Sequence, residues 1–216
     1  MAKLSLVSLA LFFHLYLAGM ANSAIPGHST PANFIRNSCR ATRYPALCVQ
    51  CLSGYGHAIR NEHQLAVTAL SVSLSRARSA AAFVGKLTKV RGIKKREFLA
   101  VKDCIENMGD GVDRLSQSVK ELGHVGRAVG QDFTWHMSNV QTWVSAALTD
   151  ENTCLDGFDG RFMDGNVKAA IRRRVTNVAQ VTSNALALVN RFAARHQAAA
   201  VTQLQQSPRS LRFRLR

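Results

Sequence analysis

The sequence predicts an all-α protein in which four long helices form a bundle. Only four prolines occur among the 216 residues, and none lies between residues 46 and 207. Proline removes a backbone hydrogen bond from a helix interior, so this long proline-free stretch favours helices. Apolar residues recur within it at steps of three and four, the spacing along one helix face, with no sustained alternation typical of a sheet. Four such stripes exist, and each must be buried against the others.

Four apolar stripes define the expected helices in chain order. Their members are Leu70, Leu74, Ala77, Ala81, Val84 and Leu87; Val101, Ile105, Met108, Val112, Leu115, Val119 and Leu122; Phe133, Met137, Val140, Val144 and Ala147; and Ile171, Val175, Val178, Val181, Ala185, Leu188 and Phe192. Each stripe covers one face of an amphipathic helix. Helices of about 20 to 30 residues suit a bundle of this kind.

Turn signals separate the stripes. They are a basic link at 89–96 that contains Gly92, the glycines at 123, 126 and 130, and two Asp-Gly pairs at 156–157 and 159–160. Gly109 and Gly111 lie inside the second stripe, where each costs up to about 1 kcal/mol relative to alanine. We therefore expect the second helix to be the least regular of the four, or to allow another backbone to approach closely.

The first residues are typical of a secretory signal peptide. Lys3 is the only charge there, an apolar run extends from Leu4 to about Ala18, and small residues follow at 21–24. The run is too short and too early for a convincing membrane span, and the alternative to a cleaved leader is a signal anchor. We predict a leader at 1–24 and a secreted chain with no membrane contact after its removal.

The rest of the chain divides into a domain and a tail. The domain is expected at 25–195, because helical periodicity fades from about His196 onward. The segment 196–216 ends in a stretch with several arginines and no acid, which predicts a basic, disordered tail.

The net charge is strongly positive. It is +15 for the whole chain and falls to +14 when Lys3 is removed with the leader. Such a charge is typical of nucleic-acid binding, but a secreted protein rarely meets nucleic acid, so none is expected as a partner. Acidic polysaccharide is the expected polyanion, and the alternative is a charge that serves only solubility and non-specific adhesion.

The five cysteines are candidates for disulfides, because export leads to an oxidising compartment. Cys104 lies inside the second expected helix and Cys154 just after the third stripe, so a bridge would tie neighbouring helices. Closing that loop of about 50 residues stabilises by about 4 kcal/mol on the chain-entropy model. Cys39 can close a small loop with either Cys48 or Cys51, at a turn formed by Tyr44-Pro45.

Two other interpretations of the Cys48-x-x-Cys51 pair are weaker. A redox centre of the thioredoxin type needs a strand-to-helix setting, whereas the surroundings appear helical. A zinc site needs a second pair of ligands, and the nearby His57 and His63 form no recurring finger pattern. We therefore predict structural disulfides, with no metal and no cofactor.

Four segments resemble the plant pectin methylesterase inhibitor and invertase inhibitor family. They are NFIRNSCRATRYPALCVQCL (33–52), DCIENMGDGVDRLSQSVKEL (103–122), VQTWVSAALTDENTCLDGF (140–158) and SNALALVN (183–190). The resemblance extends in order from about 33 to 192. It implies an up-and-down four-helix bundle preceded by a small N-terminal helical hairpin.

The resemblance also implies which cysteines pair. The bridges are Cys39–Cys48 and Cys104–Cys154, which makes Cys51 the free thiol. Position 51 is not where members of this family are expected to carry a spare cysteine. It is either a buried, inert thiol or a link between two molecules.

The implied function is inhibition without catalysis. Members of this family bind a carbohydrate-active enzyme of the plant cell wall and cover its active-site cleft. No catalytic arrangement is recognisable in this chain, which agrees with that role. The expected location is therefore the apoplast and cell wall, and the expected complex contains one inhibitor and one pectin methylesterase.

Three alternatives remain at this point. Invertase inhibitors share the fold, but they tend to carry a Pro-Lys-Phe segment that this chain lacks. A non-inhibitory wall protein that binds acidic pectin through its basic surface is a second alternative. The third is the pro-region of a complete esterase, although the chain carries no catalytic domain.

The resemblance maps the contacts with the esterase onto five residues, which are Glu106, Asp110, Asp113, Thr153 and Asp156. Their acidic character contrasts with the basic chain and suggests a local complement to one partner. The alternative for the carboxylates is a solvated helix face. For Thr153 the alternative is a helix-end cap, while its interface role would be to donate or accept a hydrogen bond.

Overall fold

The computed structural model describes residues 30–126, 128–160, 163 and 165–206, and the predicted leader lies outside them. These residues form helices and no strand, so the predicted all-α class is confirmed. The elements are α2 (Pro31–Cys39), α3 (Pro45–Leu52), the short 3-10 helix η1 (Ser53–Tyr55), α4 (Glu62–Leu87), α5 (Lys95–Val125), α6 (Gly130–Asp156) and α7 (Asn166–Gln206).

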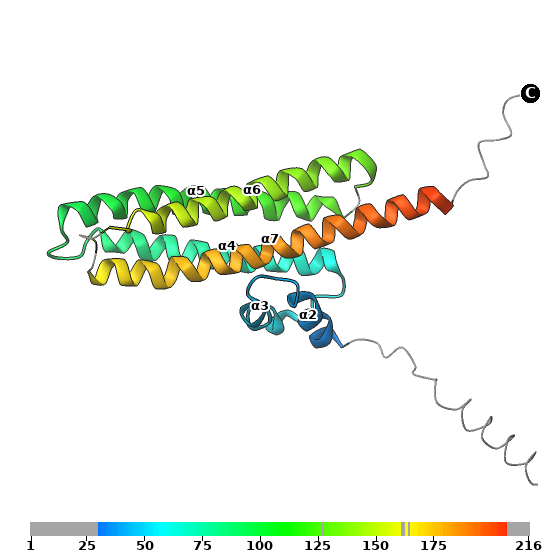
Figure 1. Cartoon of the computed structure of the whole chain (residues 1–216), viewed down its shortest axis with the longest axis horizontal. Helices are drawn as coiled ribbons and strands as arrows, with labels where there is room; N and C mark the ends of the chain where they lie inside the picture. Colours follow the sequence, from blue (N-terminus) through cyan, green and yellow to red (C-terminus); the bar gives the residue numbers. More distant parts are fainter. Residues whose placement is uncertain (1–29, 127, 161–162, 164, 207–216) are drawn as a thin grey trace, which may run out of the picture. The chain divides into compact units, whose positions relative to one another are not determined.

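The four long helices pack as a closed ring. Helix α5 contacts α4 and α6, and α7 contacts the same two helices from the other side (Figure 1). The links between consecutive helices are short, as in an up-and-down bundle of antiparallel neighbours. The seam between α5 and α6 therefore lies on the opposite side of the bundle from the seam between α4 and α7.

The core is built from the four predicted stripes. Leu70, Met108, Val140 and Ile171, one from each long helix, are fully enclosed. Some stripe members, such as Ile105, are only half-buried and pack against the edge of the core. Removing this apolar surface from water is the main favourable term in folding.

Gly111 allows α5 and α6 to approach closely. A Cβ added to this buried glycine would lie 3.6 Å from the backbone oxygen of Ala147 on α6, whereas one added to Gly109 would meet nothing within 4 Å. The expectation of a close backbone approach is confirmed at Gly111. The expectation of an irregular second helix is wrong, because α5 is helical from Lys95 to Val125 without a break.

The predicted N-terminal hairpin is formed by α2 and α3. The Cys39–Cys48 disulfide joins the two helices, and Pro45 occupies the first turn of α3, where its missing N–H costs nothing. The hairpin packs on α7 and α4. Tyr44 N–H donates to Asn184 Oδ1 and Asn184 Nδ2 donates to the Tyr44 carbonyl, both over 2.9 Å, so one side chain of α7 holds the hairpin turn.

The last helix is longer than the periodicity predicted. Disorder was expected from residue 196, yet α7 continues to Gln206; residues 207–216 of the predicted tail lie outside the described residues. Alanine, glutamine and leucine dominate residues 197–206, and these residues favour helix even without an apolar stripe. The His196 ring also stacks on Phe133 with ring centroids 3.6 Å apart.

Candidate functional site

The five predicted contact residues lie on two adjacent helices and are all exposed. Glu106, Asp110 and Asp113 are on α5, and Thr153 and Asp156 are in the last turn of α6. We call this set of five residues the acidic seam. Because α5 and α6 are neighbours in the ring, the five residues lie on two adjacent helices.

A disulfide fixes the two helices of the acidic seam. Cys104 and Cys154 are bonded as expected, with their Cα atoms 4.3 Å apart, and both side chains are buried. Cys154 directly follows Thr153, and Cys104 lies two residues before Glu106. The bridge therefore limits sliding of the threonine past the acidic row of α5.

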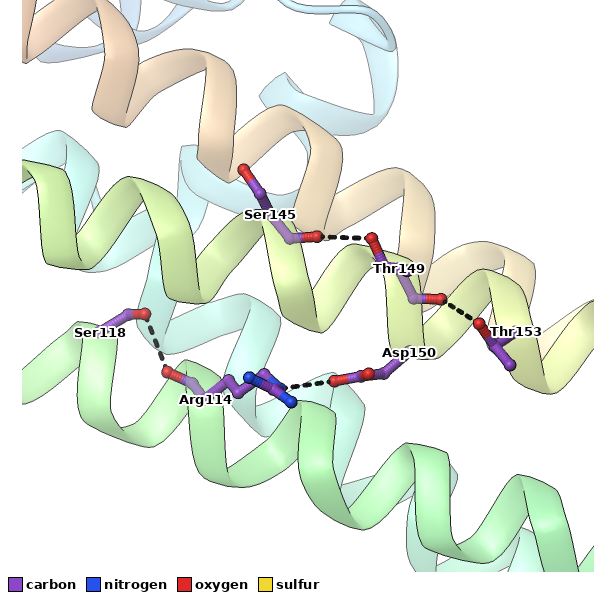
Figure 2. Close-up of polar contacts among 6 residues, drawn as sticks. All are labelled: Arg114, Ser118, Ser145, Thr149, Asp150 and Thr153. Atoms are coloured by element: carbon purple, nitrogen blue, oxygen red, sulfur yellow. Dashed lines mark hydrogen bonds and ion pairs between the residues drawn. The ribbon is translucent and has the colours of Figure 1, made fainter.

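An ion pair is the second link between α5 and α6 beside the disulfide. Arg114 Nε donates to Asp150 Oδ2 over 2.9 Å, from α5 to α6, as Figure 2 shows. Partial burial raises the pKa of Asp150, the Arg114 guanidinium opposes that rise, and the negative charge of Asp110 adds to it.

Thr153 is held by a ladder of hydroxyl bonds along α6. Thr149 Oγ1 donates to the Ser145 carbonyl over 3.1 Å, and Thr153 Oγ1 donates to the Thr149 carbonyl over 2.9 Å (Figure 2). The alternative of a helix-end cap is therefore wrong, since the hydroxyl bonds back into its own helix. The single hydroxyl hydrogen is used within the helix, which leaves the oxygen lone pairs available to accept a hydrogen bond from a partner.

Glu151 is a buried acid on α6, two residues before Thr153, and it is not among the residues predicted from the sequence. Its side chain is fully enclosed, and burial raises its pKa to about 8 although the Thr182 hydroxyl opposes that rise. Thr182 Oγ1 donates to Glu151 Oε1 over 2.8 Å, and Ser73 Oγ lies 2.7 Å from Thr182 Oγ1. Because Thr182 gives its only hydrogen to Glu151, Ser73 is the donor to Thr182. The network joins α6, α7 and α4.

Three residues near the site, Glu151, Arg114 and Asp150, were not predicted from the sequence, and for Glu151 a signal is present. Glu151 continues the third stripe at a step of four after Ala147, and Cys154 follows at three, so its burial is predictable from the period. The Arg114–Asp150 pair has no such signal. It depends on the relative positions of two helices, which a single sequence does not give.

The structure also shows the state of the other cysteines. Cys48 is bonded to Cys39, so the Cys48-x-x-Cys51 pair is not available for redox chemistry or metal binding. Cys51 is the free thiol; it lies on α3 of the hairpin and is half-buried. His63 Nε2 lies 2.8 Å from the Leu122 carbonyl of α5. Across the described ranges, no three His, Cys, Asp or Glu residues form a group that could hold a metal ion.

Comparisons with known proteins agree with this fold. A solved structure, a mutant form of a pectin methylesterase inhibitor from Arabidopsis, matches with a TM-score of 0.58 and 22% identity, covering 70% of this chain and 92% of that one. This likeness shows the fold. Pectinesterase inhibitor 9 from Arabidopsis thaliana is 60% identical over 177 residues, which is 80% of this chain and 87% of the relative.

A second relative and a family model extend the comparison. The 21 kDa protein from Daucus carota is 54% identical over 170 residues, covering 78% of this chain and 88% of the relative. The family model described as plant invertase/pectin methylesterase inhibitor matches residues 33–188, a range that includes the hairpin, both disulfides and most of the bundle. The chain therefore belongs to the plant invertase/pectin methylesterase inhibitor family.

Proposed function

We propose that the protein is a secreted inhibitor of pectin methylesterase, which binds one enzyme molecule through the acidic seam and covers its active-site cleft. The family consists of inhibitors, so the chain is not itself a catalyst. The observation that carries the choice of target is the relative named pectinesterase inhibitor, at 60% identity over 87% of its length. The absence of Pro-Lys-Phe from this sequence also favours the esterase over invertase.

The acidic seam supports a mode of binding by a rigid surface. Its carboxylates are exposed, and its two helices are tied by a disulfide and an ion pair. A surface that is already ordered loses little conformational entropy when a partner binds. Exposed carboxylates on a strongly basic protein also steer a partner that presents complementary positive charge.

The sequence supports export to the cell wall. The leader predicted at 1–24 directs the chain out of the cell, where a pectin-modifying enzyme would be met. Within the part of the chain that the structure describes, no helix is both long enough and apolar enough to cross a membrane.

The direct test is inhibition of two enzymes in parallel. The purified secreted chain, without its leader, is titrated against a plant pectin methylesterase and against a cell-wall invertase. We expect saturable loss of esterase activity at a stoichiometry of one to one and no effect on invertase. Loss of invertase activity alone would reassign the target, and no effect on either enzyme at saturation would overturn the proposed function.

The role of the acidic seam has its own test. The double substitution Asp110→Asn and Asp113→Asn removes two seam charges and should weaken esterase inhibition about tenfold, since exposed charge pairs contribute up to about 1 kcal/mol each. Asp132→Asn is the matched control, because Asp132 is an exposed aspartate in the first turn of α6, away from the seam. Equal potency of the double variant and the control would remove the seam from the interface.

A further inference from the structure

A groove with three arginines lies between α4 and α7. Its cavity has a volume of about 360 Å³, and its polar lining consists of Arg76, Ser79, Arg173, Arg174 and Asn177. We call this set of five residues the arginine groove. It lies on the α4–α7 seam, and therefore on the opposite side of the bundle from the acidic seam.

The N-terminal hairpin leaves the arginine groove open. The hairpin covers the α4–α7 seam around Ala69 and Val72 of α4 and around Asn184 and Leu188 of α7. The groove begins one to two turns further along each helix. The hairpin thus covers one half of the α4–α7 seam and leaves the other half, with the arginine groove, accessible.

Two of the three guanidinium groups are held in place. Arg76 Nη1 donates to Asn177 Oδ1 over 2.6 Å, which links α4 to α7. The Arg174 guanidinium stacks over the Phe83 ring, with its central carbon 3.9 Å from the ring centroid. A guanidinium group presents its N–H donors as a planar fork. A fork that is already oriented loses less conformational entropy when it binds a carboxylate.

Among the described residues, the positive charge of the groove has no carboxylate beside it. None of the carboxylates in the described ranges lies within 4.0 Å of the Arg76, Arg173 or Arg174 side chains. Arginines elsewhere do have such partners, namely Arg114, Arg172, Arg191 and Arg195. The groove therefore concentrates cationic groups whose natural complement is an external anion.

We propose that the arginine groove binds the carboxylates of de-esterified pectin, a linear polymer of galacturonate. Arginine forks pair with carboxylates through two parallel hydrogen bonds, and three forks along a groove match an anion that repeats along a chain. Ser79 and Asn177 supply polar groups for sugar hydroxyls. The choice of this polymer rests on the proposed function, because a methylesterase inhibitor acts where ester hydrolysis leaves free carboxylates.

Binding of the secreted chain to size-defined oligogalacturonate tests the proposal without any esterase. The groove variant carries Arg76→Gln, Arg173→Gln and Arg174→Gln, and its matched control carries the same change at the exposed Arg40, Arg43 and Arg91. Calorimetry should show an affinity about tenfold weaker for the groove variant, and within about twofold of the parent for the control. The fully methyl-esterified oligomer should not bind the parent.

A third variant separates geometry from charge. Replacing the three groove arginines by lysine keeps the charge but removes the forks, so it should weaken binding by an intermediate amount. Circular dichroism verifies that each variant is folded, and Arg173→Gln alone serves if the triple variant is not. Esterase inhibition by the groove variant should equal that of the parent, so failure of one proposal does not imply failure of the other.

Several outcomes would overturn the proposal. Equal losses in the groove variant and the control would show attraction by net charge alone. Equal binding of polyglutamate and oligogalacturonate would show a non-specific polyanion surface. An unchanged affinity in the groove variant would assign the binding to other basic segments of the chain.

Discussion

The structure shows which way the Thr153 hydroxyl donates its hydrogen bond, which the sequence alone does not specify. Its hydrogen is donated within α6 to the Thr149 carbonyl, and its oxygen remains exposed beside the Cys104–Cys154 bridge. On the proposed interface it therefore accepts a hydrogen bond from the esterase. The esterase would supply the donor, because the Thr153 hydrogen is used within the helix.

Replacing Thr153 by valine should weaken esterase inhibition about three- to tenfold, because a net hydrogen bond contributes about 0.5–1.5 kcal/mol. Thr134→Val is the matched control, since Thr134 makes the same bond back to a carbonyl in α6, at the other end of the helix. Inhibition constants for parent, variant and control measure the effect. If the two valine variants inhibit equally well, the Thr153 oxygen does not contact the enzyme.

The buried Glu151 makes stability depend on pH. In the folded protein its pKa is about 8, against 4.5 for the ordinary side chain. Between these values the folded state holds a proton that the unfolded state has released, so the free energy of unfolding falls as pH rises. Its Oε2 has no hydrogen-bond partner among the described residues, and ionisation would leave a buried charge with a single donor.

Glu151→Gln should flatten this dependence. The parent is expected to lose up to about 1.4 kcal/mol per pH unit between about pH 4.5 and about pH 8, whereas the glutamine variant should lose much less and be the more stable protein at the upper end. Urea unfolding across this range measures both slopes. Parallel slopes for the two proteins would contradict a raised pKa at Glu151.

Among single residues, the sequence predicts burial better than pairing. The step of four from Ala147 to Glu151 places the acid on the buried face, but its partner Thr182 is on another helix. The groove arginines show even more clearly that the sequence does not predict which residues of different helices meet. Arg76 and Arg173 are far apart in the sequence and come together only through the packing of α4 on α7.

At the scale of elements, the apolar stripes were sufficient to predict the four long helices. Each stripe has an unambiguous period and a turn signal separates it from the next, so helix type and order follow from the pattern. The end of α7 was not predictable in this way. Beyond His196 the helix is supported by the propensity of alanine and glutamine rather than by an apolar face, and periodicity does not detect that contribution.

The two glycines of α5 give a prediction about helix packing. Gly111→Leu should destabilise the protein by about 1–3 kcal/mol, because an added Cβ already contacts Ala147 and a longer side chain would push α6 away. Gly109→Leu is the control with open space around it, and it should stabilise the helix by up to about 1 kcal/mol. Urea unfolding of both variants measures the difference, and similar free energies would argue against the close approach.

For the molecule as a whole, the ring order of the bundle determines how its charges are arranged. The acidic seam lies on α5 and α6, and the arginine groove lies on α4 and α7. A protein with a net charge of +15 thus keeps an acidic surface on one side without neutralising it internally. Two partners of opposite charge can therefore approach the bundle from opposite sides.

This arrangement predicts that both partners bind together. Inhibitor already saturated with pectin methylesterase should retain oligogalacturonate with the affinity of the free inhibitor, because the two surfaces do not overlap. Calorimetric titration of the complex measures this affinity, and a complex made with the groove variant corrects for oligomer held by the enzyme. Mutually exclusive binding would mean that the two surfaces overlap or are coupled.

Taken together, the two proposals place the esterase and the polymer on opposite sides of the bundle, so inhibition would respond to the product of the target enzyme. Each ester that the esterase hydrolyses leaves a carboxylate on the polymer, and each such carboxylate would be a further ligand for the arginine groove. Inhibition would then be strongest where de-esterification has advanced furthest, which is local negative feedback on modification of the wall.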